Sequence, residues 1–209
     1  MLGGGGRGAE TFNVAAMRLP GVARFDYIPG EMKQTIVMYG NPVLREKSRV
    51  VEQVDDTIRT LARDMLDTMY AHEGVGLAAE QIGRTESMCV IDVTGAKPRP
   101  GRAPEPAPAM PMPVVMINPK ITAMDGSQVG PEGCLSFPEV YVNIRRAATV
   151  RASWMDLDGK MQEADASGLL ARAIQHELDH LEGVLLVDRM SVAQRVAVAG
   201  KLKRLKRGE

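Results

Sequence analysis

The feature that most constrains the fold is a helical pattern over residues 169–181, which holds two of the chain's three histidines. Apolar side chains recur there at spacings of three and four, as they do on the buried face of an amphipathic helix. They are Leu169, Leu170, Ala173, Ile174, Leu178 and Leu181, and Gly183 follows as a typical helix end. His176 and His180 are four residues apart, so both imidazoles must lie on one side of this helix. The chain therefore has to fold around a helix that carries two neighbouring imidazoles.

The residues from His176 to His180 read H-E-L-D-H, so a glutamate follows the first histidine directly. In the pattern H-E-x-x-H the two imidazoles bind one metal ion, and the glutamate acts as a general base toward water. A chance occurrence on a helix surface is the alternative interpretation. It is the weaker one, because the helical pattern rests on the leucines alone and histidine is scarce in this chain. We therefore expect a catalytic metal site that includes Glu177.

Two histidines do not complete a metal site, and the third ligand decides the class of enzyme. The long metzincin pattern would place a third histidine at position 186, where this chain has leucine. Glu182 is too close along the same helix and Glu209 is the last residue, so the ligand should come from upstream. Cys134 lies between turn residues, whereas Cys89 lies inside the apolar stretch S-M-C-V-I-D-V. We therefore expect Cys134 to bind the metal, which leaves a fourth position for water, and Cys89 to pack in the core.

A third stretch, residues 74–81, reads G-V-G-L-A-A-E-Q. Its first six residues match the dinucleotide fingerprint G-x-G-x-x-A, but that motif must follow a strand and open a helix. Here an amphipathic helix pattern over residues 54–69 precedes it, so we reject a nucleotide site. The two glycines instead allow a ligand to approach the backbone closely, and Gln81 offers a neutral donor for negative charge that develops on an oxygen.

The remaining patterns indicate the fold class. Short stretches at 87–93 and 114–118 are rich in β-forming residues, and residues 140–162 alternate around an Asp158-Gly159 hairpin turn. A last helical pattern covers residues 192–205 and is followed by further basic residues. Strands separated unevenly by two or three helices predict an α+β fold. We expect mostly antiparallel sheets packed around the metal-binding helix, and a C-terminal helix.

Glycine and proline mark the stretches outside this core. Residues 1–33 contain a glycine run and no apolar stretch like that of a signal peptide, so we expect a flexible N-terminal extension. Residues 97–113 contain seven prolines, which exclude a helix or a central strand and predict a loop inserted into the domain. Residues 34–209 are therefore expected to form a single catalytic domain that carries this proline-rich insertion.

Charge and composition exclude several partners. The chain has 26 basic and 26 acidic residues, and a net charge of zero argues against specific binding to DNA. No apolar run approaches the roughly 18 residues that a membrane-spanning helix needs, so no membrane association is expected. The two cysteines lie far apart in the sequence and indicate a reducing compartment. The expected location is the cytoplasm, with an organelle as the alternative because residues 1–33 are ambiguous.

Three motifs occur in order along the chain: G-V-G-L-A-A-E-Q, then E-G-C-L-S, then Q-H-E-L-D-H. Together they resemble the peptide deformylase family, loosely from about residue 35 to residue 190, and the resemblance does not cover residues 1–33. It implies removal of the formyl group from the N-terminal formyl-methionine of nascent polypeptides, with release of formate. It also implies one divalent metal ion per chain, with Fe²⁺ as the expected native ion and Zn²⁺, Ni²⁺ or Co²⁺ as alternatives.

The resemblance makes Cys134, His176 and His180 the metal ligands and Glu177 the general base and acid. Two other classes stay open on the residues alone. A zincin-like endopeptidase would share the H-E-x-x-H motif but predicts no role for Cys134. A non-catalytic module would need a fourth protein ligand for a structural metal ion, and only one cysteine and one histidine remain spare.

The same resemblance assigns the contacts with the substrate. Gln81 and the backbone N–H of Leu135 would stabilise the oxyanion. Backbone groups of Gly76 and of the segment around Gly133 would pair with the extended peptide, and Val75 would help to line the methionine pocket. The expected partners are thus N-formyl-methionyl nascent peptides. Docking at the ribosome through the basic C-terminal helix is a further expectation that the resemblance raises.

Overall fold

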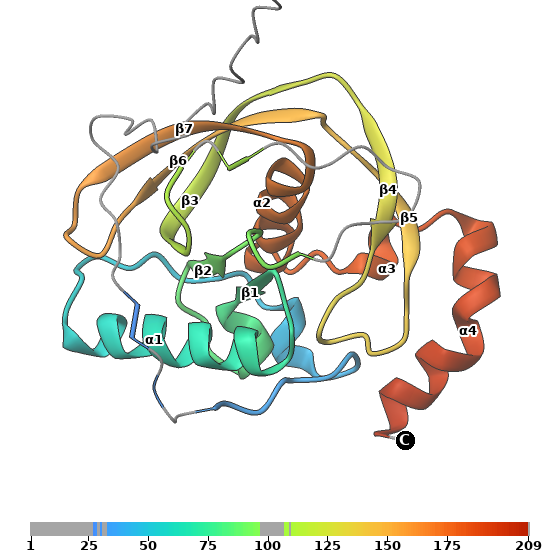
Figure 1. Ribbon diagram of the computed structural model, residues 1–209. Helices are drawn as coiled ribbons and strands as arrows, with labels where there is room; N and C mark the ends of the chain where they lie inside the picture. The colour runs from blue at the N-terminus through green and yellow to red at the C-terminus, as the bar shows by residue number, and fades with distance from the viewer. Residues whose placement is uncertain (1–26, 29, 31–32, 97–106, 109, 209) are drawn as a thin grey trace, which may run out of the picture.

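The computed structural model describes residues 27–28, 30, 33–96, 107–108 and 110–208, and Figure 1 shows their arrangement. The described α-helices are α1 (Asp56–Ala71), α2 (Gly168–Leu181), α3 (Leu186–Arg189) and α4 (Val192–Arg207), and the 3₁₀-helices are η1 (Pro42–Arg45) and η2 (Ala79–Ile82). The strands are β1 (Gly76–Ala78), β2 (Met88–Ile91), β3 (Val114–Asp125), β4 (Gln128–Glu132), β5 (Val142–Arg146), β6 (Thr149–Met155) and β7 (Met161–Ser167).

The strands form two antiparallel sheets. Five of them pair in the order β1-β2-β3-β6-β7, and β4 pairs with β5 alone. Helix α2 lies in the middle of the molecule, with strands around it and α1 across the bottom of the view in Figure 1. This arrangement confirms the predicted α+β class, the antiparallel sheets, the central helix and the C-terminal helix.

Strand β2 explains how the large sheet is covered on both faces. All four of its residues are buried, and successive side chains of a strand point to opposite faces. Cys89 and Ile91 belong to the hydrophobic core that includes the apolar side of α2. Met88 and Val90 belong to a second core, formed with the apolar side of α1. The sheet therefore separates two cores, and each helix buries its apolar stripe against one face.

A third core connects the small sheet with the C-terminal helix. It includes Phe137, Val140 and Val142, which lie in or just before β5. Side chains from one side of α4 pack against this core, namely Val198, Leu202 and Leu205. Helix α4 therefore lies beside the segment that joins β4 to β5, where Cys134 is also found.

Helix α1 is found where the sequence predicts an amphipathic helix over residues 54–69, but it begins and ends two residues later, at Asp56 and Ala71. The side chain of Asp55 caps it by accepting a 2.9 Å hydrogen bond from the Ile58 N–H, and the last turn ends at His72. Within α1, the buried Asp67 accepts hydrogen bonds from the Tyr27 hydroxyl and from the Gly30 N–H. Residues 1–26 and much of the proline-rich stretch, residues 97–106 and 109, lie outside the described residues. The division into extension, domain and insertion therefore stays a prediction.

Several strands differ from the sequence patterns: β1 was not predicted, and β7 continues past residue 162 to Ser167. Strand β3 continues past the 114–118 stretch to Asp125, with a register shift between Ile117 and Lys120. A shift of this kind tolerates Pro119, which has no N–H to pair. Strand β4 has no predicted counterpart, because Gly130 and Pro131 interrupt the β-forming pattern. In the part of the chain that the structure describes, no helix has both the length and the apolar character needed to cross a membrane.

Candidate metal centre and active site

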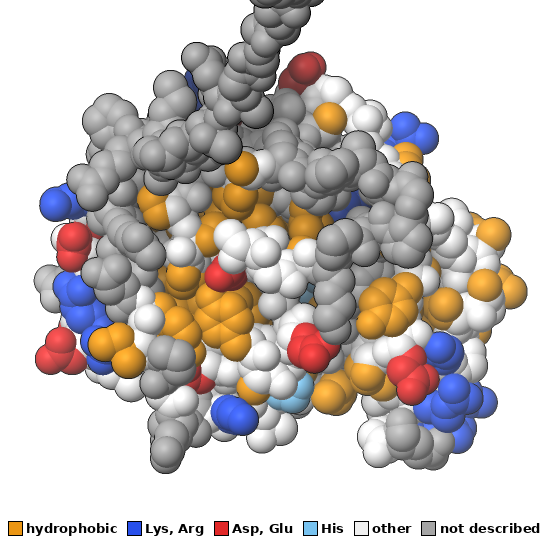
Figure 2. All heavy atoms as spheres, viewed as in Figure 1, with side chains coloured by type: hydrophobic (Ala, Val, Ile, Leu, Met, Phe, Trp, Pro, Cys, Tyr) orange, Lys and Arg blue, Asp and Glu red, His pale blue; other side chains and the backbone are white. Residues whose placement is uncertain are grey.

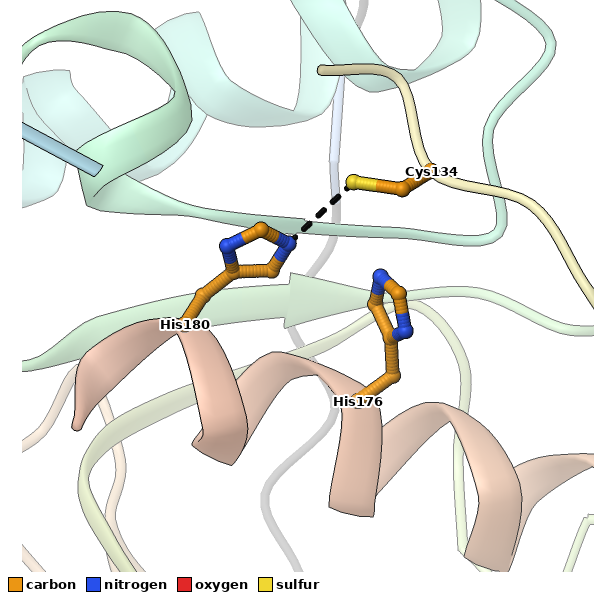
Figure 3. Close-up of side chains that lie close together, drawn as sticks. All are labelled: Cys134, His176 and His180. Atoms are coloured by element: carbon orange, nitrogen blue, oxygen red, sulfur yellow. Dashed lines mark hydrogen bonds between the residues drawn. The ribbon is translucent and has the colours of Figure 1, made fainter. Parts of the chain in front are cut away.

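Three potential metal donors converge at the centre of the molecule (Figure 3). His176 and His180 project from the same side of α2, and Cys134 reaches them from the loop after β4. The ligand atoms all lie within 4.8 Å of one another, and Cys134 Sγ is 3.2 Å from His180 Nε2. Typical metal–sulfur and metal–nitrogen bonds are about 2.0–2.3 Å long, so donors at these separations fit around one ion. One thiolate and two imidazoles also leave a coordination position for water.

The orientation of His176 is set by a buried carboxylate. Its Nδ1 lies 3.1 Å from Glu132 Oε2, at the end of β4. An Nδ1–H that donates to Glu132 leaves the Nε2 lone pair directed at the metal position. Burial by itself raises the pKa of Glu132, but hydrogen bonds from His176 and Arg146 outweigh burial and hold this pKa well below its ordinary range. Glu132 is therefore an anion that fixes the ring of one of the three potential metal donors.

Two arginines hold Glu132 in place. Arg146, at the end of β5, donates to both carboxylate oxygens at 2.9 Å, and Arg172 of α2 donates to one of them at 2.7 Å. Arg146 also donates to Asp179 at 2.6 Å, and Arg189 pairs with the same Asp179. All of these side chains except Arg189 are largely buried. Their charges are therefore balanced by one another rather than by water. The network ties β4, β5 and α3 to the histidine-bearing helix α2.

Gln81 presents its amide to the Cys134 thiol. It lies on η2, and its Oε1 accepts a 2.9 Å hydrogen bond from the Ala78 N–H. This contact turns the NH₂ group toward the centre, where Nε2 lies 3.3 Å from both Cys134 Sγ and Ser136 Oγ. The side chain is buried, so its orientation is set by these contacts rather than by water. A fixed donor at this point can stabilise negative charge beside the metal position.

Glu177 is buried next to the donors and lies against β1. Its Oε2 has no hydrogen-bond partner among the described residues. Burial raises the pKa of Glu177 to about 7, although the neighbouring His176 opposes this rise. A β-carbon built on Gly76 would lie only 2.8 Å from Glu177 Cδ, so the strand leaves room for this carboxyl only because residue 76 is glycine. The second glycine of the first motif thus makes room for the glutamate of the third.

A cavity of about 510 Å³ opens onto these groups. It is lined by the predicted site residues Val75, Gly76, Gln81, Gly133, Cys134, Leu135, His176 and Glu177. His180 does not line it, because its imidazole is fully buried, next to the Cys134 thiol. Figure 2 shows hydrophobic side chains gathered over the middle of the same face, with acidic and histidine side chains among them. The structure therefore brings together eight of the nine predicted residues at one surface and the ninth directly beneath it.

The charged network around Glu132 was not predicted from the sequence. Arg146 could have indicated it, because it follows Val142 and Ile144 at a core-facing position of a strand in which every second residue is buried. A charged residue at such a position needs a buried partner, but the partner's identity depends on packing. Cys89 is fully buried in the core between sheet and α2, as expected.

An α+β scaffold that brings a cysteine and two histidines close enough for one metal ion, with a buried glutamate beside them, is typical of the metal-dependent hydrolases. The polypeptide deformylase family model matches residues 33–196. A peptide deformylase of Methylacidiphilum infernorum is 40% identical over 177 residues, which cover 83% of this chain and 93% of that protein. The chain belongs to the polypeptide deformylase family.

Solved structures agree with this assignment. The crystal structure of peptide deformylase from Thermus thermophilus matches with a TM-score of 0.74 and 36% identity, covering 85% of this chain and 100% of that one. A peptide deformylase from Synechococcus elongatus, solved in complex with actinonin, matches with a TM-score of 0.71 and 39% identity. That match covers 83% of this chain and 94% of the Synechococcus chain.

Proposed function

We propose that Cys134, His176 and His180 hold one divalent metal ion for the deformylation reaction. The activity is that of the family: removal of the formyl group from the N-terminal methionine of nascent polypeptides, with release of formate. The observation that carries the site assignment is the approach of the three donor atoms to within 4.8 Å, beside Glu177 and Gln81 in one cavity. Neither an endopeptidase nor a structural metal site accounts for both Cys134 and Gln81 at this point.

The metal, when bound, lowers the pKa of a water molecule and withdraws electron density from the formyl carbonyl. The donor set suits several ions, because imidazole and thiolate bind both Fe²⁺ and Zn²⁺. We propose Fe²⁺ as the native ion, from the family resemblance, with Zn²⁺, Ni²⁺ or Co²⁺ as alternatives. Metal analysis after anaerobic purification, paired with activity, identifies the ion.

Glu177 is proposed to move the proton. A carboxyl group with a pKa of about 7 both accepts and donates protons near neutral pH, and burial is what raises this pKa. Glu177 would take a proton from the attacking water as the new carbon–oxygen bond forms. It would then give that proton to the methionine nitrogen as the carbon–nitrogen bond breaks, so that formate and a free N-terminus are released. The Oε2 atom has no competing partner among the described residues, which supports this role.

Gln81 and the Leu135 N–H are proposed to stabilise the formyl oxygen as it gains negative charge. Both residues line the cavity next to Cys134, and the Gln81 amide is held in a single orientation by Ala78 and Ser136. A donor that is already oriented does not have to reorganise during the reaction, which is why such groups lower the barrier.

The substrate is proposed to bind as an extended strand between Gly76 and Gly133. Strand β1 is the first strand of the five-stranded sheet, so no neighbouring strand among the described residues occupies its outer edge. An extended peptide can add to an exposed edge of this kind through backbone hydrogen bonds. Val75 lines the cavity beside this edge and is proposed to contact the methionine side chain.

Formate release from a formyl-methionyl peptide tests this proposal. Glu177→Gln should keep the metal and lose activity by about 10²–10⁴-fold, the usual contribution of a general acid–base group. Cys134→Ser should lose the metal as well as the activity. Full activity of Glu177→Gln with its metal retained would reject the assigned role, and metal retention by Cys134→Ser would reject the ligand set.

Two further expectations concern cellular context. The cytoplasm is the proposed location, because both cysteines are free thiols and one of them is proposed to bind the metal. The ribosome is proposed as a docking partner for the basic last turn of α4. Unchanged co-sedimentation with ribosomes after deletion of residues 201–209 would count against that docking.

A further inference from the structure

One wall of the cavity is shared with the C-terminal helix. Phe137, Glu139 and Tyr141 line the cavity, and they lie on the loop between β4 and β5. Phe137 and Val140 of the same loop are buried in the third core, against which Val198, Leu202 and Leu205 of α4 pack. The loop is therefore a thin layer with the substrate cavity on one side and α4 on the other.

Lys201 of α4 makes a polar contact with this layer. Its Nζ donates a 2.7 Å hydrogen bond to the backbone carbonyl of Glu139 and lies 3.9 Å from the Glu139 carboxylate. The φ angle of Glu139 is 59°, in the left-handed region that side chains other than glycine rarely adopt. Such a conformation persists only where surrounding contacts hold it. Lys201 supplies one of these contacts from outside the cavity.

The loop returns from Glu139 to the substrate site through Tyr141. The Tyr141 ring lies directly over Gly133, because a β-carbon built on Gly133 would be 2.6 Å from Tyr141 Cε1. Gly133 precedes the ligand Cys134, and its backbone is proposed to pair with the peptide. Tyr141 itself is 75% exposed, so it stands at the open end of the cavity and away from the buried donors.

We propose that Lys201 is a positioning residue for the outer part of the substrate groove. By holding the Glu139 carbonyl, it fixes the peptide units that lead to Tyr141 and so keeps the ring over Gly133. The part of the substrate affected is the peptide that follows formyl-methionine, because that part must leave through the open end. The inference rests on the proposed function, since it takes Gly133 as a substrate contact.

The contact is specific within α4. Lys203, two residues further along the same helix, is exposed and has the same charge. A general effect of positive charge on α4 would therefore appear at both lysines, whereas a positioning effect requires Lys201. His176 and His180 lie on α2. Cys134 lies at the start of the same loop, where its Sγ contacts Gln81 and His180 rather than α4, so the chemical step should not change.

The test uses the full-length, metal-loaded protein and two substrates, formyl-methionine amide and a formyl-methionyl tetrapeptide amide. Lys201→Met should raise KM for the tetrapeptide about three- to tenfold, the effect of losing one hydrogen bond of ordinary strength at a partly exposed position. The KM for formyl-methionine amide and both kcat values should stay within about twofold. Lys201→Arg, which keeps a charged donor, should restore the tetrapeptide KM, and Lys203→Met is the matched control.

The inference is overturned if Lys201→Met leaves the tetrapeptide KM unchanged, or raises KM equally for both substrates. It is also overturned if Lys203→Met has the same effect, or if Lys201→Arg fails to restore KM while its thermal unfolding matches the wild type. These outcomes leave the proposed function intact as long as the wild-type protein releases formate. Wild-type protein that releases none, with its metal bound, rejects the proposed function and this inference together.

Discussion

Replacing Gly76 with alanine should displace the carboxyl group of Glu177 while leaving the fold in place. The added β-carbon would lie 2.8 Å from Glu177 Cδ and 3.1 Å from Glu177 Cγ. Non-bonded carbon atoms prefer separations of about 3.5–4.0 Å, so the carboxyl must retreat by roughly 1 Å. The atoms that move belong to the end of a side chain, and the backbone of β1 and α2 has no reason to shift.

The magnitude follows from that displacement. A misplacement of about 1 Å costs on the order of 10²-fold in rate, so kcat should fall about a hundredfold, or roughly 2.7 kcal/mol in the barrier. The free energy of unfolding should change much less, because only a side-chain terminus is crowded. The assay is formate release under saturating peptide, with metal content and thermal unfolding measured on the same preparations.

Gly95→Ala is the matched control, because a β-carbon built there meets nothing within 4 Å. Because Gly76 is also proposed to pair with the peptide, a second control distinguishes an effect on the Glu177 carboxyl from an effect on substrate binding. In a Glu177→Gln background the Gly76→Ala change should cost far less, because both act through one group. An undiminished hundredfold loss in that background, or full activity of Gly76→Ala with metal bound, would refute the reasoning.

Two further predictions concern the buried charges. Arg146→Met should destabilise the fold by about 3–5 kcal/mol and weaken metal binding about 10–100-fold, because it removes two hydrogen bonds from the carboxylate that orients His176. Urea unfolding and chelator competition measure this, and an equal effect of Arg151→Met, whose ion pair is exposed, would contradict it. Burial raises the pKa of Glu80 from 4.5 to about 8, against a smaller effect of its own backbone amide. Between about pH 4.5 and pH 8 the Glu80 carboxyl therefore stays protonated in the folded state but is ionised in the unfolded state. The free energy of unfolding consequently falls as the pH rises through this range. The free energy of unfolding of Glu80→Gln should therefore increase relative to that of the wild type over this range. A difference between the two proteins that stays the same at about pH 5, 7 and 9 would contradict this.

The helix that carries the two histidines could be predicted from the sequence alone. Apolar residues at spacings of three and four specify one buried side of α2, and the helical repeat makes residues 176 and 180 neighbours whatever the rest of the chain does. The choice of Cys134 over Cys89 also followed from local context, because Cys89 lies in an apolar strand and Cys134 among turn residues. The structure agrees, with Cys89 in the core and Cys134 next to both histidines.

The partners of these residues were decided only by the tertiary structure. Glu132 meets His176 across 44 residues and Arg172 across 40, and each contact joins a strand to a helix. The glycine at position 76 shows the same limit, since its sequence context indicated close approach but not that Glu177 is the group approaching. Periodicity is set by backbone geometry within one element, so a sequence reveals it directly. Contacts between elements depend on how those elements pack. The network around Glu132 and the contact of Lys201 with Glu139 are both of this kind, so only the tertiary structure reveals them.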